Sequence, residues 1–66
     1  MSAASLEEVI VALSRQVHND LALRPVCTRV MLRTGVNLRA PRPDQIGDKA
    51  LLGKVVGTLS EMGYKL

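Results

Sequence analysis

Few residues of this chain carry the groups that catalysis or metal binding requires. Cys27 is the only cysteine and His18 the only histidine among the 66 residues. A nucleophile needs a base within hydrogen-bonding reach and a metal centre needs several ligands, and the sequence offers neither set. We expect Cys27 to be a small core residue rather than a reactive thiol, and His18 to interact with the C-terminal end of a helix dipole. The sequence predicts a protein that is not an enzyme and that binds no metal, cofactor or small-molecule substrate.

The charged residues are distributed unevenly along the chain. The formal net charge is +3, from nine lysines and arginines against six aspartates and glutamates. Residues 1–23 hold one basic side chain against three acidic ones, whereas residues 24–54 hold seven basic against two acidic. A basic middle segment on an otherwise near-neutral domain indicates an anionic partner, and nucleic acid is the commonest. The alternative is a basic face that is simply solvated.

Length and composition predict one small helical domain over residues 1–66. Hydrophobic residues make up 47% of the chain, which is too many for a disordered tail. With no disulfide and no metal to stabilise so small a core, association with another subunit is the support that remains. The longest apolar runs fall far short of the ~20 residues of a membrane span, and the N-terminus lacks the basic start of a signal peptide. We expect a soluble, cytoplasmic protein that does not bind membranes.

The clearest element in the sequence is a first helix near the N-terminus. Ser5 and Glu8 form an S-x-x-E capping box, in which each side chain bonds an unpaired backbone N–H at the helix start. The apolar residues that follow have the i, i+3, i+4, i+7 spacing of one helical face. They are Leu6, Val9, Ile10, Leu13 and Val17. Asn19 and Asp20 are expected to end this helix.

A short strand, a second helix and a loop are predicted next. The residue before a proline is driven towards extended geometry, so residues 21–23 are expected to be a short strand. Pro25 suits the first position of a helix and Gly35 its left-handed end. The inner face of this helix is expected to contain Val26, Cys27, Val30, Met31 and Thr34. Residues 36–47 are predicted to be irregular because the prolines among them lack N–H donors.

The third helix is predicted to begin at Asp48, or one residue earlier at Gly47, and to end at Gly63 in the left-handed conformation. Its buried stripe is expected to contain Leu52, Val55, Val56, Leu59 and Met62. Tyr64 lies where a Schellman motif places an apolar residue against Leu59. Residues 64–66 alternate apolar, polar and apolar, as a short strand would.

Gly53 and Gly57 interrupt this third helix at positions where glycine is costly. Each interior glycine costs roughly 1 kcal/mol relative to alanine. Lys49, the two glycines and Ser60 fall on one line of the helix, away from the apolar stripe. We expect this bare line to admit a close partner, either a second helix in a dimer or a DNA backbone or groove wall with Lys54 supplying further charge. The alternative is that the glycines contact nothing and only lower stability.

The C-terminal segment DKALLGKVVGTLSEMGYKL resembles the third helix and first wing strand of winged-helix DNA-binding domains, in which that helix enters the major groove. The resemblance depends on a short set of residues. They are Val55 or Val56, Leu59, Glu61, Met62, Gly63 and Tyr64. The order of elements is also similar, with residues 21–23 in the place of the strand that pairs with the wing. Residues 36–47 are longer than a tight helix-turn-helix connection, and by residue 66 the wing has at most its first strand.

The resemblance implies a mainly α fold, a three-helix bundle with a minimal two-strand β-ribbon. It also implies a set of DNA-facing residues. On the third helix they are Lys49, Gly53, Lys54, Gly57 and Ser60, and in the loop Arg39 and Arg42 would contact the DNA backbone or minor groove. We therefore expect a non-catalytic nucleic-acid-binding protein, with duplex DNA favoured, that forms a homodimer. The alternative is a small helical adaptor, ribosome-associated or otherwise, that dimerises or docks through the face of the two glycines.

Overall fold

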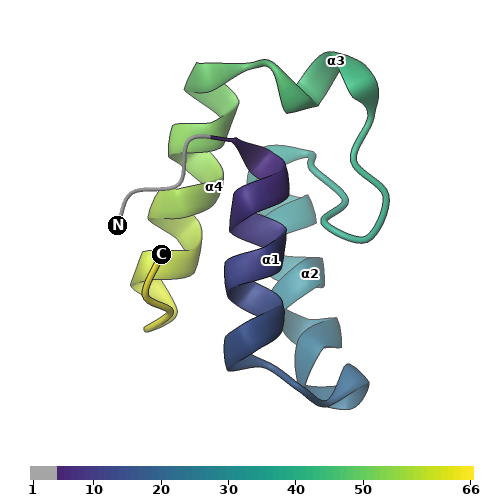
Figure 1. The fold of residues 1–66 in the computed structure, drawn as a ribbon, viewed down its shortest axis with the longest axis vertical. Helices are drawn as coiled ribbons and strands as arrows, with labels where there is room; N and C mark the ends of the chain where they lie inside the picture. The colour runs from purple at the N-terminus through teal and green to yellow at the C-terminus, as the bar shows by residue number, and fades with distance from the viewer. Residues whose placement is uncertain (1–4) are drawn as a thin grey trace.

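The computed structural model describes residues 5–66, which form four helices (Figure 1). They are α1 (Leu6–Gln16), α2 (Asp20–Thr34), α3 (Pro43–Ile46) and α4 (Lys49–Glu61). The prediction of a mainly helical fold is confirmed. The two-strand β-ribbon is wrong, because residues 5–66 contain no strand.

Each of the three longer helices begins at a residue whose side chain accepts a backbone N–H of the first turn. The accepting atoms are Oγ of Ser5, Oδ1 of Asn19 and Oδ1 of Asp48, at 2.8 to 3.3 Å from the donating nitrogen. Such caps satisfy one of the orphan donors at a helix start. The starts predicted at Ser5 and Asp48 are confirmed. Asn19, which was expected to end the first helix, instead caps the second.

α2 begins at Asp20 rather than at Pro25, so residues 21–23 are helical and the predicted strand there is wrong. Pro25 lies inside α2, where its missing N–H removes one helical hydrogen bond. The cap at Asn19 and the ion pair of Asp20 with Arg24, one turn later, stabilise the first turn. These local interactions, together with the burial of Val26, outweigh the extended preference of the residue before a proline.

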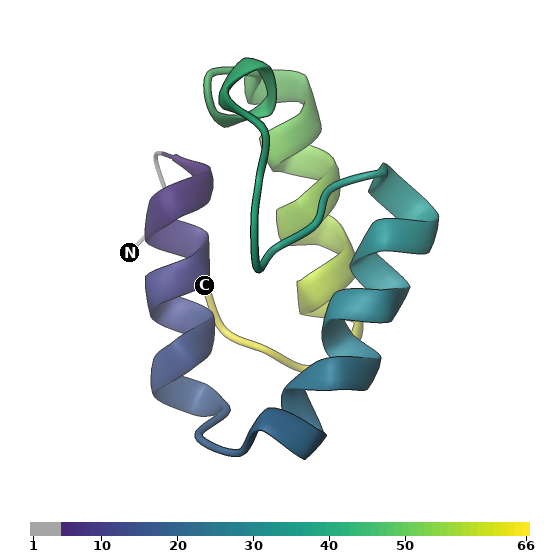
Figure 2. The same ribbon diagram turned by 90° about the vertical axis from the view of Figure 1, so that its right-hand side faces the viewer.

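The core lies between α1, α2 and α4, and the loop from α2 to α3 closes one side of it (Figure 2). Its buried side chains are Leu6, Val9, Leu13, Val26, Val30, Val36, Leu38, Val55 and Leu59. The inner faces predicted for the first and third helices are therefore confirmed at their central positions. Val36 and Leu38 come from the segment predicted to be irregular, and their burial fixes the path of that segment over the core.

A buried glutamine joins α3 to the end of α2. Gly35 ends α2 in the left-handed conformation, with φ +77°, as predicted. Gln45 of α3 is buried, its Nε2 donates to the carbonyl of Gly35, and its Oε1 accepts from the backbone N–H of Arg42, both at 3.2 Å. Residues 36–47 were predicted to be irregular throughout, but they contain the single helical turn of α3, with Pro43 at its first position.

The C-terminal end of α4 forms the predicted Schellman motif. Gly63 has φ +94°, the N–H of Tyr64 donates to the carbonyl of Leu59 at 3.1 Å, and that of Gly63 donates to the carbonyl of Ser60 at 3.0 Å. These two bonds satisfy carbonyl groups that a helix end leaves unpaired. The signal of a glycine followed by an apolar residue was therefore sufficient to place this end.

The strand predicted over residues 64–66 does not form, because a side chain of α1 takes the backbone groups that a strand partner would use. Oε1 of Gln16 accepts from the N–H of Lys65 at 3.1 Å, and Nε2 of Gln16 donates to the carbonyl of Lys65. An amide side chain can pair with a peptide unit in this way because it carries both a donor and an acceptor. The segment is thereby held against the C-terminal end of α1.

Candidate nucleic-acid interface

The exposed side of α4 brings together all five residues predicted on the third helix. Lys49, Gly53, Lys54, Gly57 and Ser60 are exposed, on the side of α4 away from the buried Val55 and Leu59. A β-carbon added to Gly53 or to Gly57 would meet no atom within 4 Å. The exposure expected of the glycine line is confirmed, and the glycines are not needed for packing inside the monomer.

The two lysines beside these glycines are free of intramolecular carboxylates. Within residues 5–66, neither Lys49 nor Lys54 takes part in an ion pair, whereas Glu61 at the end of α4 pairs with Arg33 of α2. The exposed side of α4 therefore carries positive charge that is available to an external anion.

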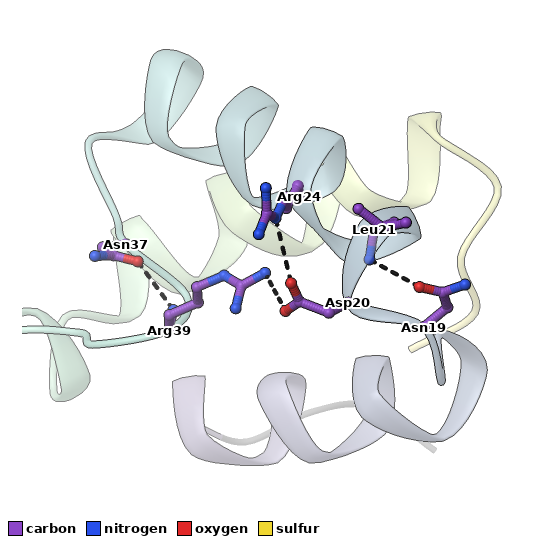
Figure 3. A network of polar contacts seen from close by, with 6 residues as sticks. All are labelled: Asn19, Asp20, Leu21, Arg24, Asn37 and Arg39. Carbon is purple, nitrogen blue, oxygen red and sulfur yellow. Dashed lines mark hydrogen bonds and ion pairs between the residues drawn. The ribbon is translucent and has the colours of Figure 1, made fainter.

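Both loop arginines, in contrast, have a carboxylate partner within the chain. Nη2 of Arg39 lies 2.7 Å from Oδ1 of Asp20, and Nε of Arg42 lies 3.5 Å from Oδ1 of Asp44. Figure 3 shows Arg39 extended towards the start of α2, where Asp20 also accepts from Arg24. The hydrogen bond from Arg39 and then that from Arg24 hold the pKa of Asp20 below its usual value.

The loop that carries Arg39 and Arg42 lies on the other side of the fold from α4. In Figure 1 the loop and α3 are at the right and α4 is at the left, with α1 and α2 between them. The structure brings the five α4 residues into one surface and leaves the two arginines outside it. The sequence could not show this separation, because it follows from the burial of Val36 and Leu38 at the start of the loop.

Sequence reasoning missed an exposed apolar strip on the outer side of α2. Leu32 is 81% exposed, Leu21 is 69% exposed, and Met31, predicted on the inner face, is 41% exposed. Arg29 and Arg33 are also exposed on α2. Had α2 been extended back to Asp20, the helical spacing of Leu21, Pro25 and Leu32 would have revealed a second line of apolar residues.

The two residues first considered for catalysis lie apart. Cys27 is half-buried at a hollow of about 310 Å³ between α1, α2 and the loop, and His18 is exposed in the connection between α1 and α2. No group of three potential metal ligands occurs within residues 5–66. In the same part of the chain, no helix combines the length and the hydropathy that crossing a membrane requires.

Comparisons with protein-family models, with curated protein sequences and with solved structures found no match. The function is therefore inferred from the surfaces of the chain itself.

Proposed function

We propose that the protein binds nucleic acid without catalysing a reaction, and that the exposed side of α4 contacts duplex DNA. The observation that supports this is the combination of Lys49 and Lys54, neither of them paired with a carboxylate within residues 5–66, with two glycines that leave the helix backbone open. Lysines supply the sequence-independent attraction to phosphate that dominates such affinities. The open glycines allow the duplex to approach the helix axis more closely than side chains would.

The dimensions of α4 suit this role. Its 13 residues extend about 20 Å at 1.5 Å per residue, and the major groove of B-DNA, about 12 Å wide, admits one helix. Ser60 adds a hydroxyl group that can donate to a phosphate oxygen. In this proposal α4 enters the major groove, as the third helix of winged-helix domains does, and no wing contacts the DNA.

Arg39 and Arg42 enter the proposal only as secondary phosphate contacts. Each would have to exchange its carboxylate partner for a phosphate, and the loop faces away from α4 (Figure 1). Exposed ion pairs of this kind contribute little stability, so the exchange is feasible, but it gives these arginines a cost that the unpaired Lys49 and Lys54 do not have. We therefore expect α4 to account for most of the affinity.

The test is the salt dependence of binding to a labelled duplex of random sequence, followed by fluorescence anisotropy. Lys49→Ala and Lys54→Ala should each flatten the slope of log K against log salt concentration by about one. Lys65→Ala, which removes an exposed lysine outside α4, is the matched control and should leave the slope unchanged. Arg39→Ala and Arg42→Ala should have smaller effects. Failure of the wild-type protein to bind any duplex at low salt would overturn the proposal.

The open glycines also support a second candidate, the helical adaptor that packs a partner helix on the face of Gly53 and Gly57. Small residues allow two helix backbones to approach closely, as they do between helices in membranes. In that case Gly57→Leu should abolish self-association or partner binding in the absence of nucleic acid. Sedimentation that shows the same monomer for the wild type and for Gly57→Leu would exclude self-association through this face.

A further inference from the structure

The outer side of α2 carries an exposed leucine, Leu32, near two arginines. Pro25, Thr28, Arg29, Leu32 and Arg33 line a hollow of about 390 Å³, and we call these residues the α2 face. Leu32 is 81% exposed, more than any other large hydrophobic residue in the described part of the chain. Arg33 pairs with Glu61, whereas Arg29 forms no ion pair within residues 5–66.

A second hollow lies on the other side of Leu32. It has a volume of about 380 Å³, and its lining includes Met31, Asn37 and Arg39. Leu32 is therefore a ridge between two depressions rather than an isolated surface leucine. Methionine and arginine are enriched at protein–protein interfaces and lysine is depleted. This composition distinguishes the α2 face from the lysine- and glycine-rich side of α4 and favours a protein partner.

The charge of the α2 face disfavours a symmetric dimer through it. A two-fold interface places the same patch of both subunits together, so the basic α2 faces of the two copies, each with Arg29 and Arg33, would lie close to each other. Like charges brought together at an interface cost several kcal/mol. The partner surface must therefore be acidic, and it must offer an apolar site for Leu32.

The outer side of α1 has both properties. Glu7, Glu8, Val11, Ala12 and Arg15 line a hollow of about 360 Å³, and we call these residues the α1 face. Val11 is 49% exposed, and Glu7 forms no ion pair within residues 5–66. The acidic residues are at the N-terminal end of this face and Arg15 is at its C-terminal end.

We propose that the α2 face of one molecule docks on the α1 face of a second copy. A parallel arrangement of the two helices places Leu32 in the hollow beside Val11 and brings Glu7, four residues before Val11, to Arg29, three residues before Leu32. Residues 7–15 rise about 12 Å along α1, so Arg15 then lies past the C-terminal end of α2, beyond both arginines. The contact thus joins an apolar centre to a charge pair at its edge, as stable interfaces do. This proposal does not depend on nucleic-acid binding.

The arrangement of the two faces makes this association open-ended. α1 and α2 lie on opposite flanks of the fold (Figure 2), and their outer sides point away from each other. A head-to-tail contact between different surfaces leaves a free face at each end and forms chains unless the rotation closes a ring. The average mass should therefore rise continuously with protein concentration and fall with added salt, which screens exposed charges.

The experiment uses two variants that each block one face. Leu32→Asp places an acid on the α2 face and Val11→Arg places a base on the α1 face, and both positions are exposed, so the core is unchanged. In sedimentation velocity without nucleic acid, each variant alone should associate about tenfold or more weakly than the wild type. An equimolar mixture should associate again, because each variant keeps one intact face and the two introduced charges are opposite and meet at the other contact. Circular dichroism should show that both variants are folded.

Ala50→Arg adds the same charge as Val11→Arg on the exposed side of α4 and should associate like the wild type. A wild-type protein that remains monomeric at the highest attainable concentration would overturn the proposal. So would a mixture of the two variants that stays monomeric, or self-association that Gly57→Leu abolishes and Leu32→Asp leaves intact. The last result would assign the contact to the glycine line instead.

Discussion

Arg39, in the loop between α2 and α3, forms an ion pair with Asp20, the first residue of α2, with Nη2 2.7 Å from Oδ1 (Figure 3). The other oxygen of Asp20 accepts from Nε of Arg24 at 3.2 Å. Asn37 accepts from the backbone N–H of Arg39 at 3.0 Å and fixes the turn that directs Arg39 towards α2. One carboxylate thus connects the beginning of α2 to the loop that follows its end.

This contact predicts a specific dependence of stability on pH. Arg39 first, and then Arg24, lower the pKa of Asp20 below its usual value of 3.8. A group whose pKa is lower in the folded state contributes stability above its unfolded pKa and loses it as the pH falls through the folded pKa. Asp20→Asn should therefore reduce the free energy of unfolding at neutral pH, and its difference from the wild type should shrink below pH 3.8.

Urea denaturation of both proteins over a pH series measures this difference. Arg39→Ala should reproduce part of the effect, because it removes the main cause of the lowered pKa. Asp44→Asn, which removes an exposed carboxylate from α3, controls for the change in net charge. A difference between Asp20→Asn and the wild type that stays constant from neutral to acid pH would contradict the role assigned to Arg39.

The parts of the fold that could be predicted are those that depend on residues close in sequence. The starts at Ser5 and Asp48, the left-handed end at Gly63 and the apolar stripes of α1 and α4 all follow from local spacing. The start of α2 was missed because two local signals conflict there, the cap at Asn19 and the extended preference before Pro25. The sequence alone does not show which of them prevails.

The contacts that could not be predicted join residues far apart in the chain. Gln16 with Lys65, Gln45 with Gly35, and Arg39 with Asp20 leave no periodic pattern in the sequence. The same holds for the candidate interface. The exposed side of α4 could be predicted because the apolar stripe identifies the opposite, buried side. The position of Arg39 and Arg42 could not, because it depends on the path that the buried Val36 and Leu38 impose on the loop.

The glycines of α4 provide a second prediction, and Gly63, just past the end of α4, provides the contrasting substitution. Gly53→Ala and Gly57→Ala should each raise the free energy of unfolding by about 0.5 to 1 kcal/mol, because both lie inside a helix and a β-carbon meets no atom. Gly63→Ala should lower it by about 1 to 2 kcal/mol, since φ is +94° there. Urea denaturation distinguishes the opposite signs. If Gly53→Ala and Gly57→Ala instead lower the free energy of unfolding, the space beside these two glycines is not open as described.

Gln45 gives a third prediction, about a buried polar side chain. Its amide is shared between the carbonyl of Gly35 and the N–H of Arg42. Gln45→Leu keeps the size of the side chain but leaves both backbone groups without their partner, which should cost about 1 to 3 kcal/mol. Gln45→Glu keeps the bond from Arg42 and loses only the donor to Gly35, so it should fall between Gln45→Leu and the wild type at neutral pH. Equal stabilities of all three proteins would show that the two hydrogen bonds of Gln45 add nothing to the stability of the fold.

The pairing of Gln16 with Lys65 gives the last prediction, about local opening rather than global stability. Oε1 of Gln16 accepts from the N–H of Lys65 and Nε2 donates to its carbonyl, so Gln16→Ala removes both bonds and leaves the core residues in place. We expect the amide of Lys65 to exchange with solvent deuterium faster, because it then lacks a protecting acceptor. The amides of Leu59 and Val55, which lie in α4, should keep their protection. Ser14→Ala removes another exposed polar side chain of α1 whose hydroxyl bonds only within that helix, and it should leave the exchange of Lys65 unchanged. Equal exchange of Lys65 in the wild type and in Gln16→Ala would mean that the segment opens independently of α1.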